Sequence, residues 1–258
     1  MFIYAYARSN YEQNKIPYCL SYMGNLSYFK LTPEDRFFNF LKRLYFKFFI
    51  KNKSDIIFLN VDDCWEDHTT IKFDYNKNYI VSGYFQGEMY FKNISNKIPK
   101  LFDIKKRYKV EFDKIRKHVD GTYTAVHIRR GDYSYVKGSE RFGGPVLTLP
   151  DSYYKKAILK YHNNDKIVFI SDEINNIKNW FQDIKNSYFK SNSEIIDFQI
   201  ILNSKTCIIS NSTFSWWAAW LNQNPNKIIV APEYFLGFKI KKEFPLNIIP
   251  LNWIKQEV

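Results

Sequence analysis

Two adjacent arginines behind a strand-like run are the first candidates for chemistry in this sequence. The run spans 123–128, and Arg129, Arg130, Gly131 and Asp132 follow it. Two permanent cations at this place can hold a pyrophosphate through fork-shaped, charge-assisted hydrogen bonds, and a glycine beside them lets the backbone approach closely. The alternative is a local ion pair between Arg129 and Asp132, and these residues alone leave both interpretations open.

Polar residues also follow two later strand-like runs. Asp172 follows the run at 166–170, where a carboxylate can accept hydrogen bonds from the ring N–H and amino group of a guanine; the alternative is helix capping by Ser171 or Asp172. The segment 211–215 joins a run at 206–210 to a helix. Hydroxyl groups, backbone N–H groups and the helix dipole there predict an anion site, with a plain cap as the alternative.

The second half of the chain alternates short apolar runs with helical patterns. Strands of five or six residues that alternate with helices are typical of a parallel, doubly wound sheet. In such a sheet the ligand crevice lies beyond the carboxyl ends of the strands, where the three polar segments are found. The predicted strands are 123–128, 166–170, 206–210 and 227–231, and the predicted helices are 151–162, 172–181, 194–203 and one that starts near 213.

The first half is less regular. Its predicted elements are a helix over 2–12 and strands over 16–22, 56–59 and 79–83. Thr32 and Pro33, with an acid three residues after the threonine, predict the start of a basic amphipathic helix that runs to Ile50. This helix either packs its apolar face on the sheet or docks on an anionic membrane.

Composition limits the classes of protein to consider. The chain has 258 residues, 45% hydrophobic and 19% aromatic, which excludes wholesale disorder and fits one large or two small α/β domains. We find no run of about 18 apolar residues and no basic-then-apolar leader, so we expect neither a transmembrane helix nor secretion. Three separated cysteines without a Cys-x-x-Cys pair fit a reducing cytoplasm.

The charge and the pattern of possible metal ligands narrow the partners. The net charge of +12 is spread over both halves and suits anionic ligands, but no nucleic-acid-binding module is recognised, so we expect no nucleic acid partner. The four histidines lack metal-ligand spacing and no Asp-x-Asp occurs, so we expect no metal site. Trp216, Trp217 and Trp220 are predicted to pack in the core.

Taken together, the segments resemble the inverting α-1,2-fucosyltransferases of glycosyltransferase family 11. The resemblance covers nearly the whole chain. It rests on Val126–Tyr133, Phe169–Asp172 and Ile209–Leu221, supported by Gly83–Gln86 with Glu88 and by Pro250–Ile254.

The resemblance implies a fold and an activity. The fold is α/β and GT-B-like, with an acceptor-side Rossmann-like domain at 1–120 and a GDP-sugar-binding Rossmann-like domain at 121–258, both with parallel sheets. The activity is metal-independent, cofactor-free transfer of L-fucose from GDP-fucose to the 2-hydroxyl of a terminal galactose on a glycan. The family usually opens with a strand and a glycine-rich loop, and Met1–Ala7 is similar to the continuation of that loop, so we expect the first half to be incomplete.

The resemblance also implies roles for individual residues. Arg129 is expected to be catalytic and to bind the β-phosphate, while Asp172 holds guanine. The other donor-binding residues are expected to be His127, Arg130, Asp132, Ser212, Thr213, Phe214 and Ser215. On the acceptor side we expect Gln86 and Glu88. The general base is not identified, and its candidates are Glu88, Asp62, Asp63 and Glu66.

Other interpretations stay open at this point. One is a related glycosyltransferase that uses another nucleotide sugar, because the motifs define a nucleotide pocket better than they define fucose. Another is an inactive remnant that binds a nucleotide or a glycan. We expect a cytoplasmic protein, and if helix 33–50 docks on a membrane, it associates with the inner face of the plasma membrane and takes a lipid-linked acceptor.

Overall fold

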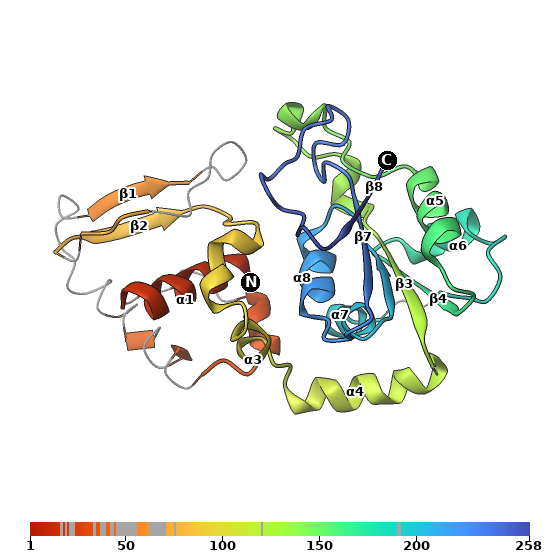
Figure 1. Ribbon diagram of the computed structural model, residues 1–258, viewed down its shortest axis with the longest axis horizontal. Coiled ribbons are helices and arrows are strands. Elements are labelled where there is room, and N and C mark those ends of the chain that lie inside the picture. The colour runs from red at the N-terminus through yellow and green to blue at the C-terminus, as the bar shows by residue number, and fades with distance from the viewer. Residues whose placement is uncertain are drawn as a thin grey trace. The chain divides into compact units, whose positions relative to one another are not determined.

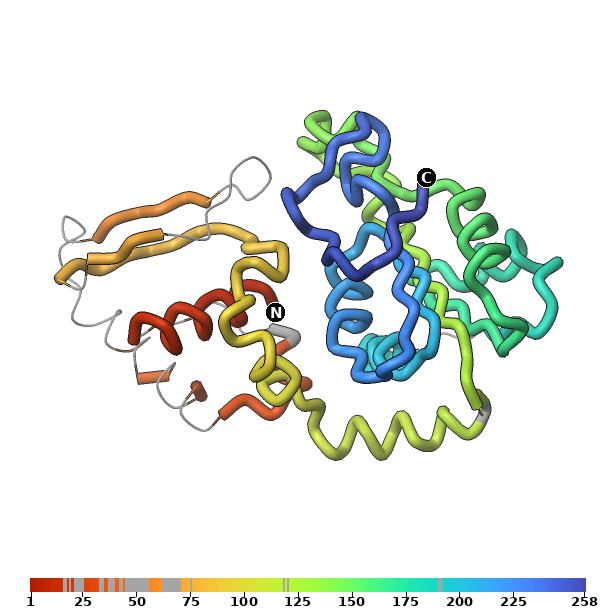
Figure 2. The backbone as a smooth tube through the Cα atoms, viewed as in Figure 1, coloured from red at the N-terminus to blue at the C-terminus, as the bar shows by residue number. Residues whose placement is uncertain are grey.

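The computed structural model divides the chain into two compact units (Figures 1 and 2). It describes residues 1–15, 18, 20, 24–32, 35–36, 40–41, 44, 56–61, 71–74, 76–119, 121–189 and 192–258. The first unit contains Met1–Lys105 and Pro245–Asn247, and the second contains Lys106–Phe244 and Ile248–Val258. The units change at residue 105, whereas the boundary predicted from the sequence is at residue 120. Both positions lie before the strand at Tyr123–Ile128.

The first unit combines helices with a small parallel sheet. Strands β1 and β2 pair in parallel, with Ile56 opposite Asn78, and helix α1 packs against η3. The predicted helix at 2–12 and the strands at 56–59 and 79–83 are confirmed within two residues, while 16–22 lies almost wholly outside the described residues. The elements are α1 (Phe2–Asn14), η1 (Gly24–Tyr28), β1 (Ile56–Asn60), β2 (Asn78–Ser82), η3 (Glu88–Ile94) and α3 (Ile98–Leu101).

Aromatic side chains hold α1 to the segment that follows β2. Tyr6 of α1 stacks on Phe85 with ring centroids 3.9 Å apart and an angle of 8° between the rings. Tyr90 of η3 meets both rings edge-on. Phe85 is buried with a positive φ of 52°, a conformation that side chains other than glycine rarely adopt, so the packing of its ring fixes the backbone beside Gln86.

A buried carboxylate secures the start of the predicted amphipathic helix. Asp35 accepts hydrogen bonds from the hydroxyls of Tyr4 and Tyr18 at 2.7 and 2.6 Å, and the Thr32 hydroxyl caps the Asp35 N–H at 3.1 Å. This confirms the predicted helix start. Of the predicted helix at 33–50 only residues 35–36, 40–41 and 44 are described, so both interpretations of its apolar face stay open.

The second unit is a six-stranded parallel sheet in the order β5-β4-β3-β6-β7-β8. Helices α5 and α6 lie on one side of it, and α7 and α8 lie on the other (Figure 1). The elements are α4 (Lys106–Arg116), η4 (Lys117–Val119), β3 (Tyr123–Ile128), η5 (Gly131–Ser134), η6 (Glu140–Phe142), α5 (Asp151–Tyr161), β4 (Lys166–Ser171), α6 (Ile174–Trp180), β5 (Ser187–Phe189), α7 (Glu194–Leu202), β6 (Thr206–Ile208), α8 (Thr213–Leu221), β7 (Ile228–Pro232) and β8 (Ile254–Gln256).

Burial on both faces explains why the strands of this sheet are continuous apolar runs. Every residue of β3 is buried, and Val126 and Ile128 pack in one core with Phe169 of β4, Ile208 of β6 and Val230 of β7. A parallel sheet covered by helices needs this pattern. The predicted fold class, α/β with parallel sheets, is confirmed.

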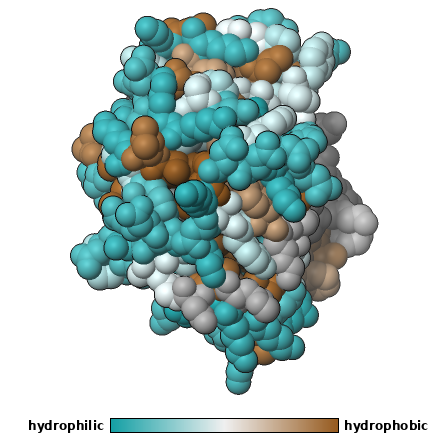
Figure 3. Space-filling model, turned by 90° about the vertical axis from the view of Figure 1, so that its right-hand side faces the viewer, coloured by the Kyte–Doolittle hydropathy of each residue, from teal (hydrophilic) through white to brown (hydrophobic). Residues whose placement is uncertain are grey.

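The helices were compared with the length and composition of membrane-spanning segments. None of the helices in the described part of the chain has both the length and the apolar composition that a bilayer-spanning segment needs. The face seen in Figure 3 is mainly hydrophilic, with apolar side chains in small groups between the polar ones.

Candidate functional site

The sheet of the second unit brings the three predicted motifs to one edge. Arg129 follows β3, Asp172 follows β4, and Ser210 follows β6. Both β4 and β6 pair with β3 in parallel, so the three strands end at the same edge. Strands β4 and β6 lie on opposite sides of β3 in the sheet. The strand order therefore reverses at β3, and open α/β sheets bind their ligands at such a topological switch point.

The Arg129 side chain lies at this edge between two carboxylates. Its Nη2 is 2.7 Å from Oδ1 of Asp132, and its Nη1 is 3.2 Å from Oδ2 of Asp172. The guanidinium also lies 5.7 Å from the ring centre of Tyr133. The predicted Arg129–Asp132 ion pair therefore forms. Since the Arg129 side chain is one-third exposed, these contacts leave it accessible to a ligand.

The neighbouring Arg130 points into the protein and not toward the open edge. Its guanidinium donates to the Leu149 carbonyl at 2.9 Å, pairs with Asp151 and lies 4.7 Å from the ring centre of Trp180. Only 11% of the side chain is exposed. Arg130 was expected to bind the donor together with Arg129, but in this structure its side chain anchors the loop to α5 and α6.

Asp172 supports the loop that carries the two arginines. Its Oδ1 accepts a hydrogen bond from the Arg130 backbone N–H at 2.9 Å, while its Oδ2 pairs with Arg129. Gly131 passes so close that a Cβ atom there would lie 2.5 Å from Oδ2 of Asp172. Both oxygens of this carboxylate therefore have partners within the loop, and guanine recognition by Asp172 stays a prediction.

His127 links the ends of β3 and β6. Its Nδ1 lies 2.8 Å from the Ser210 hydroxyl, and its ring lies 5.5 Å from the ring of Phe214. Complete burial and the nearby Arg129 charge lower the pKa of His127 to about 3. The imidazole is therefore neutral near pH 7, and the positive charge at this edge comes from Arg129.

Helix α8 begins at the same edge with a series of hydroxyl residues. Ser212 is its N-cap residue but makes no capping hydrogen bond through its side chain, so the alternative of a side-chain cap does not hold for Ser212. The Ser215 hydroxyl instead donates to the Ser212 carbonyl at 3.1 Å. Thr213 and Phe214, the first residues of the helix, are half-buried. The first N–H groups of α8 thus lie near His127 and favour an anion.

The tryptophans behind this helix pack in the core, as predicted. Trp216 is fully buried and donates through Nε1 to the Ile248 carbonyl at 2.7 Å. Trp217 meets it edge-on, and Trp220 stacks on it with an angle of 9° between the rings. These rings hold α8 in place.

The acceptor-side candidates lie in the first unit. Gln86 directly follows Phe85, Glu88 begins η3, and both side chains are half-buried. Three further candidates for the general base, Asp62, Asp63 and Glu66, lie outside the described residues. Within the described ranges, no three His, Cys, Asp or Glu side chains gather as a metal site would require.

Some residues that shape the site carry no signal in the sequence. Asp151 is the first residue of α5, after the N-cap residue Pro150, and its carboxylate pairs with Arg130. Tyr133 donates its hydroxyl to the Asn211 carbonyl at 3.3 Å, which ties the arginine loop to the segment before α8. Its place directly after Asp132 is the one feature that could have suggested this role.

Comparisons with known proteins agree with the resemblance. The model of a family described as Glycosyl transferase family 11 matches residues 29–254. The O-antigen biosynthesis glycosyltransferase WbnK of Escherichia coli is 36% identical in an alignment of 138 residues that covers 51% of this chain and 43% of that protein. An alpha-1,2-colitosyltransferase of Escherichia coli is 31% identical in an alignment of 191 residues that covers 68% of this chain and 61% of that protein. The chain thus matches less than two-thirds of the length of either relative.

Two solved structures have a distant likeness to the chain. The alpha-1,6-fucosyltransferase NodZ, co-crystallised with GDP, has a TM-score of 0.41 at 14% identity, over 58% of this chain and 53% of that one. POFUT1 in complex with GDP also has a TM-score of 0.41 at 14% identity, over 60% of this chain and 55% of that one.

Proposed function

Because this chain belongs to glycosyl transferase family 11, we propose that it transfers L-fucose from GDP-fucose to the 2-hydroxyl of a terminal galactose, with inversion at the anomeric carbon. The second unit binds the GDP-sugar at the carboxyl edge of its sheet. The transfer needs neither a metal nor an organic cofactor. A lipid-linked acceptor and contact with the inner membrane face stay predictions.

The observation that carries this proposal is the position of Arg129. Its guanidinium stands at the topological switch point, one-third exposed, and the neighbouring His127 is neutral. The first turn of α8 begins close to the same edge and adds backbone N–H groups. An arginine fork together with a helix N-terminus suits a diphosphate, which carries negative charge on several oxygens.

Departure of GDP is the step that this arrangement assists. The acceptor hydroxyl attacks the anomeric carbon from the face opposite the diphosphate, the C–O bond to GDP breaks with its electron pair, and the β linkage becomes α. Negative charge grows on the diphosphate as that bond breaks. Arg129 and the N–H groups of α8 stabilise this charge, and such stabilisation is usually the largest electrostatic contribution to catalysis.

The proton of the acceptor hydroxyl must pass to a base or to water. Glu88 is the candidate in the described part of the first unit, beside Gln86, which we propose as an acceptor contact. Glu88→Gln tests the first assignment, since a general base typically contributes about 10²–10⁴ in rate. A small change in turnover would place the base among Asp62, Asp63 and Glu66 or favour transfer to solvent.

A second donor is also supported by a specific observation. A similar protein is named an alpha-1,2-colitosyltransferase, and colitose is fucose without its 3-hydroxyl. The same nucleotide pocket therefore suits GDP-colitose, and the choice between the two donors lies in contacts to one hydroxyl group. Initial rates with GDP-fucose, GDP-colitose and GDP-mannose, measured side by side, identify the donor.

An inactive binding protein is the remaining alternative. It would bind GDP with the same dependence on Arg129 but would neither transfer nor hydrolyse any GDP-sugar in the panel. Calorimetric titration with GDP beside the turnover assay separates this case from an active enzyme.

Substitution of Arg129 tests the proposed function directly. Arg129→Ala should lower turnover by roughly 10²–10³, the usual cost of one donor to a developing oxyanion. It should leave the fold intact, because ion pairs this exposed contribute about 0–1 kcal/mol. Arg129→Lys should also lose turnover, because the point charge of an ammonium group cannot replace the two parallel hydrogen bonds of a guanidinium. Arg107→Ala removes an equal charge from exposed α4 and is the control. Near-normal turnover of Arg129→Ala would refute the proposal.

A further inference from the structure

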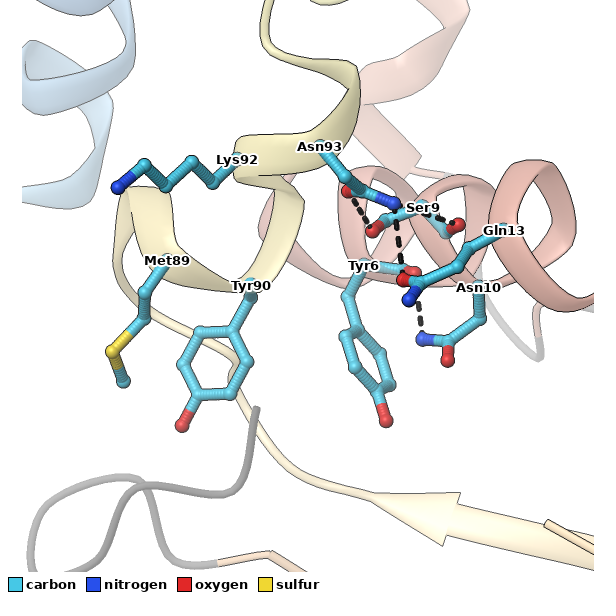
Figure 4. A pocket seen from close by; sticks show the side chains of 8 residues that line it. All are labelled: Tyr6, Ser9, Asn10, Gln13, Met89, Tyr90, Lys92 and Asn93. Carbon is cyan, nitrogen blue, oxygen red and sulfur yellow. Dashed lines mark hydrogen bonds between the residues drawn. The ribbon is translucent and has the colours of Figure 1, made fainter. Parts of the chain in front are cut away.

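The first unit contains a pocket of about 340 Å³ between α1 and η3 (Figure 4). Its volume is at the lower end of the roughly 300–1,000 Å³ typical of ligand pockets. Among the described residues, no carboxylate lines it, and Lys92 is its one charged side chain. Most of the lining consists of uncharged polar and aromatic side chains, namely Tyr6, Ser9, Asn10, Gln13, Tyr90 and Asn93.

Hydrogen bonds fix the amide groups of this pocket. Asn93 accepts from the Ser9 hydroxyl at 2.5 Å and donates to Oε1 of Gln13 at 3.2 Å. The Asn10 amide donates to the Tyr6 carbonyl at 3.0 Å. In the described part of the chain, these bonds leave Nε2 of Gln13 and Oδ1 of Asn10 without a partner. The pocket therefore offers both a donor and an acceptor to a ligand.

The aromatic wall is equally well fixed. Tyr6 is 7% exposed, stacks on Phe85 and meets Tyr90 at 90° with 5.9 Å between ring centres. Its hydroxyl is buried and has no hydrogen-bond partner among the described residues. Burial raises the pKa of Tyr6 to about 12, so this hydroxyl is neutral and can donate near pH 7. A buried polar group of this kind is normally completed by water or by a ligand.

We propose that this pocket binds a sugar ring of the acceptor glycan, other than the galactose that is modified. Sugar hydroxyls both donate and accept, which matches Gln13 and Asn10, and the C–H face of a pyranose packs on aromatic rings. The charge among the described lining residues is the positive one of Lys92, which disfavours a cationic ligand. Phe85 connects the pocket to Gln86, so the same aromatic cluster positions both. The proposal rests on the proposed function, because it takes the glycan to be that reaction's acceptor.

Direct binding to saccharides, without any donor, is the first test. The probes are lactose and lacto-N-tetraose, and their binding is measured by saturation-transfer NMR and by titration. Asn10→Ala and Gln13→Ala each remove one hydrogen bond and should raise the dissociation constant for the tetrasaccharide roughly 2–10-fold. The control is Asn96→Ala, an exposed amide three residues after Asn93 and outside the lining. The double variant combines Asn10→Ala with Gln13→Ala. If it binds the tetrasaccharide as tightly as the control does, the proposal is overturned.

Kinetics with the same variants separate this proposal from the proposed function. In the double variant, KM for the longer acceptor should rise while kcat and GDP affinity stay unchanged. Unchanged KM with normal transfer would overturn the pocket assignment and leave the function intact. Saccharide binding that depends on Gln13, without any transfer, would refute the function and support the pocket. Binding restricted to acidic sugars and lost in Lys92→Gln would overturn the assignment to a neutral sugar.

Discussion

Replacement of Arg130 by alanine should lower the free energy of unfolding of the second unit and leave its affinity for GDP nearly unchanged. The substitution removes a charged hydrogen bond to the Leu149 carbonyl, the pair with Asp151 and the contact with Trp180. The hydrogen bond to a charged group contributes about 1.5–3 kcal/mol and the cation–π contact about 0.5–2 kcal/mol. We therefore expect a loss of about 3 kcal/mol in the free energy of unfolding, or roughly 6–12 °C in Tm.

The assay compares Arg130→Ala with Arg129→Ala. Denaturant titration measures stability, and calorimetric titration with GDP, well below either Tm, measures binding. Arg129→Ala should keep its stability and lose GDP affinity, whereas Arg130→Ala should lose stability and keep GDP affinity within about tenfold. Asp151→Ala, which removes one partner of Arg130, should reproduce part of the stability loss. If Arg130→Ala keeps native stability but loses GDP binding as Arg129→Ala does, then Arg130 is a donor ligand and the reasoning is refuted.

Two further predictions concern the arginine loop and a buried acid. Gly131→Ala should lower GDP affinity about tenfold in titrations, because the added Cβ would lie 2.5 Å from Oδ2 of Asp172. In an Asp172→Ala background, Gly131→Ala should cost less affinity, because the clashing carboxylate is absent. Burial raises the pKa of Asp197 in the folded protein to about 6, whereas in the unfolded chain its pKa is near 4. The protonated carboxyl therefore contributes its full stability below about pH 4, and this contribution is lost as the pH rises through about 6. Asp197→Asn should therefore add about 1–2 kcal/mol of stability at pH 8 and little at pH 4; equal gains at both would refute this.

The sheet of the second unit could be predicted closely from the sequence. The expected strand at 123–128 agrees with β3, and the strand expected at 166–170 is β4 with one residue more. These strands are buried on both faces, so their apolar runs are continuous and end where polar residues begin. The short edge strands β5 and β8 were not predicted, because each has three residues, none of them buried, and such a short run gives no periodic signal.

The roles of the two arginines could not be separated from the sequence. Arg129 and Arg130 have the same chemistry and adjacent positions, and the direction of each side chain depends on the backbone after β3 and on distant partners. Those partners, Asp151 and Trp180, lie on α5 and α6, far along the chain. The pocket beside Tyr6 was missed for the same reason: α1 and η3 form it together, and its residues Ser9 and Asn93 are 84 positions apart in the sequence.

The path of residues 245–258 has a consequence for how the protein acquires its fold during synthesis. Residues 245–247 group with the first unit, and Ile248–Val258 belong to the second. There the Ile248 carbonyl satisfies the Trp216 indole, and β8 pairs with β7. A nascent chain that has emerged only as far as β7 therefore exposes the edge of β7 and lacks the carbonyl that accepts the Trp216 hydrogen bond. Until residues 248–256 leave the ribosome, the second unit remains open to chaperones and to aggregation.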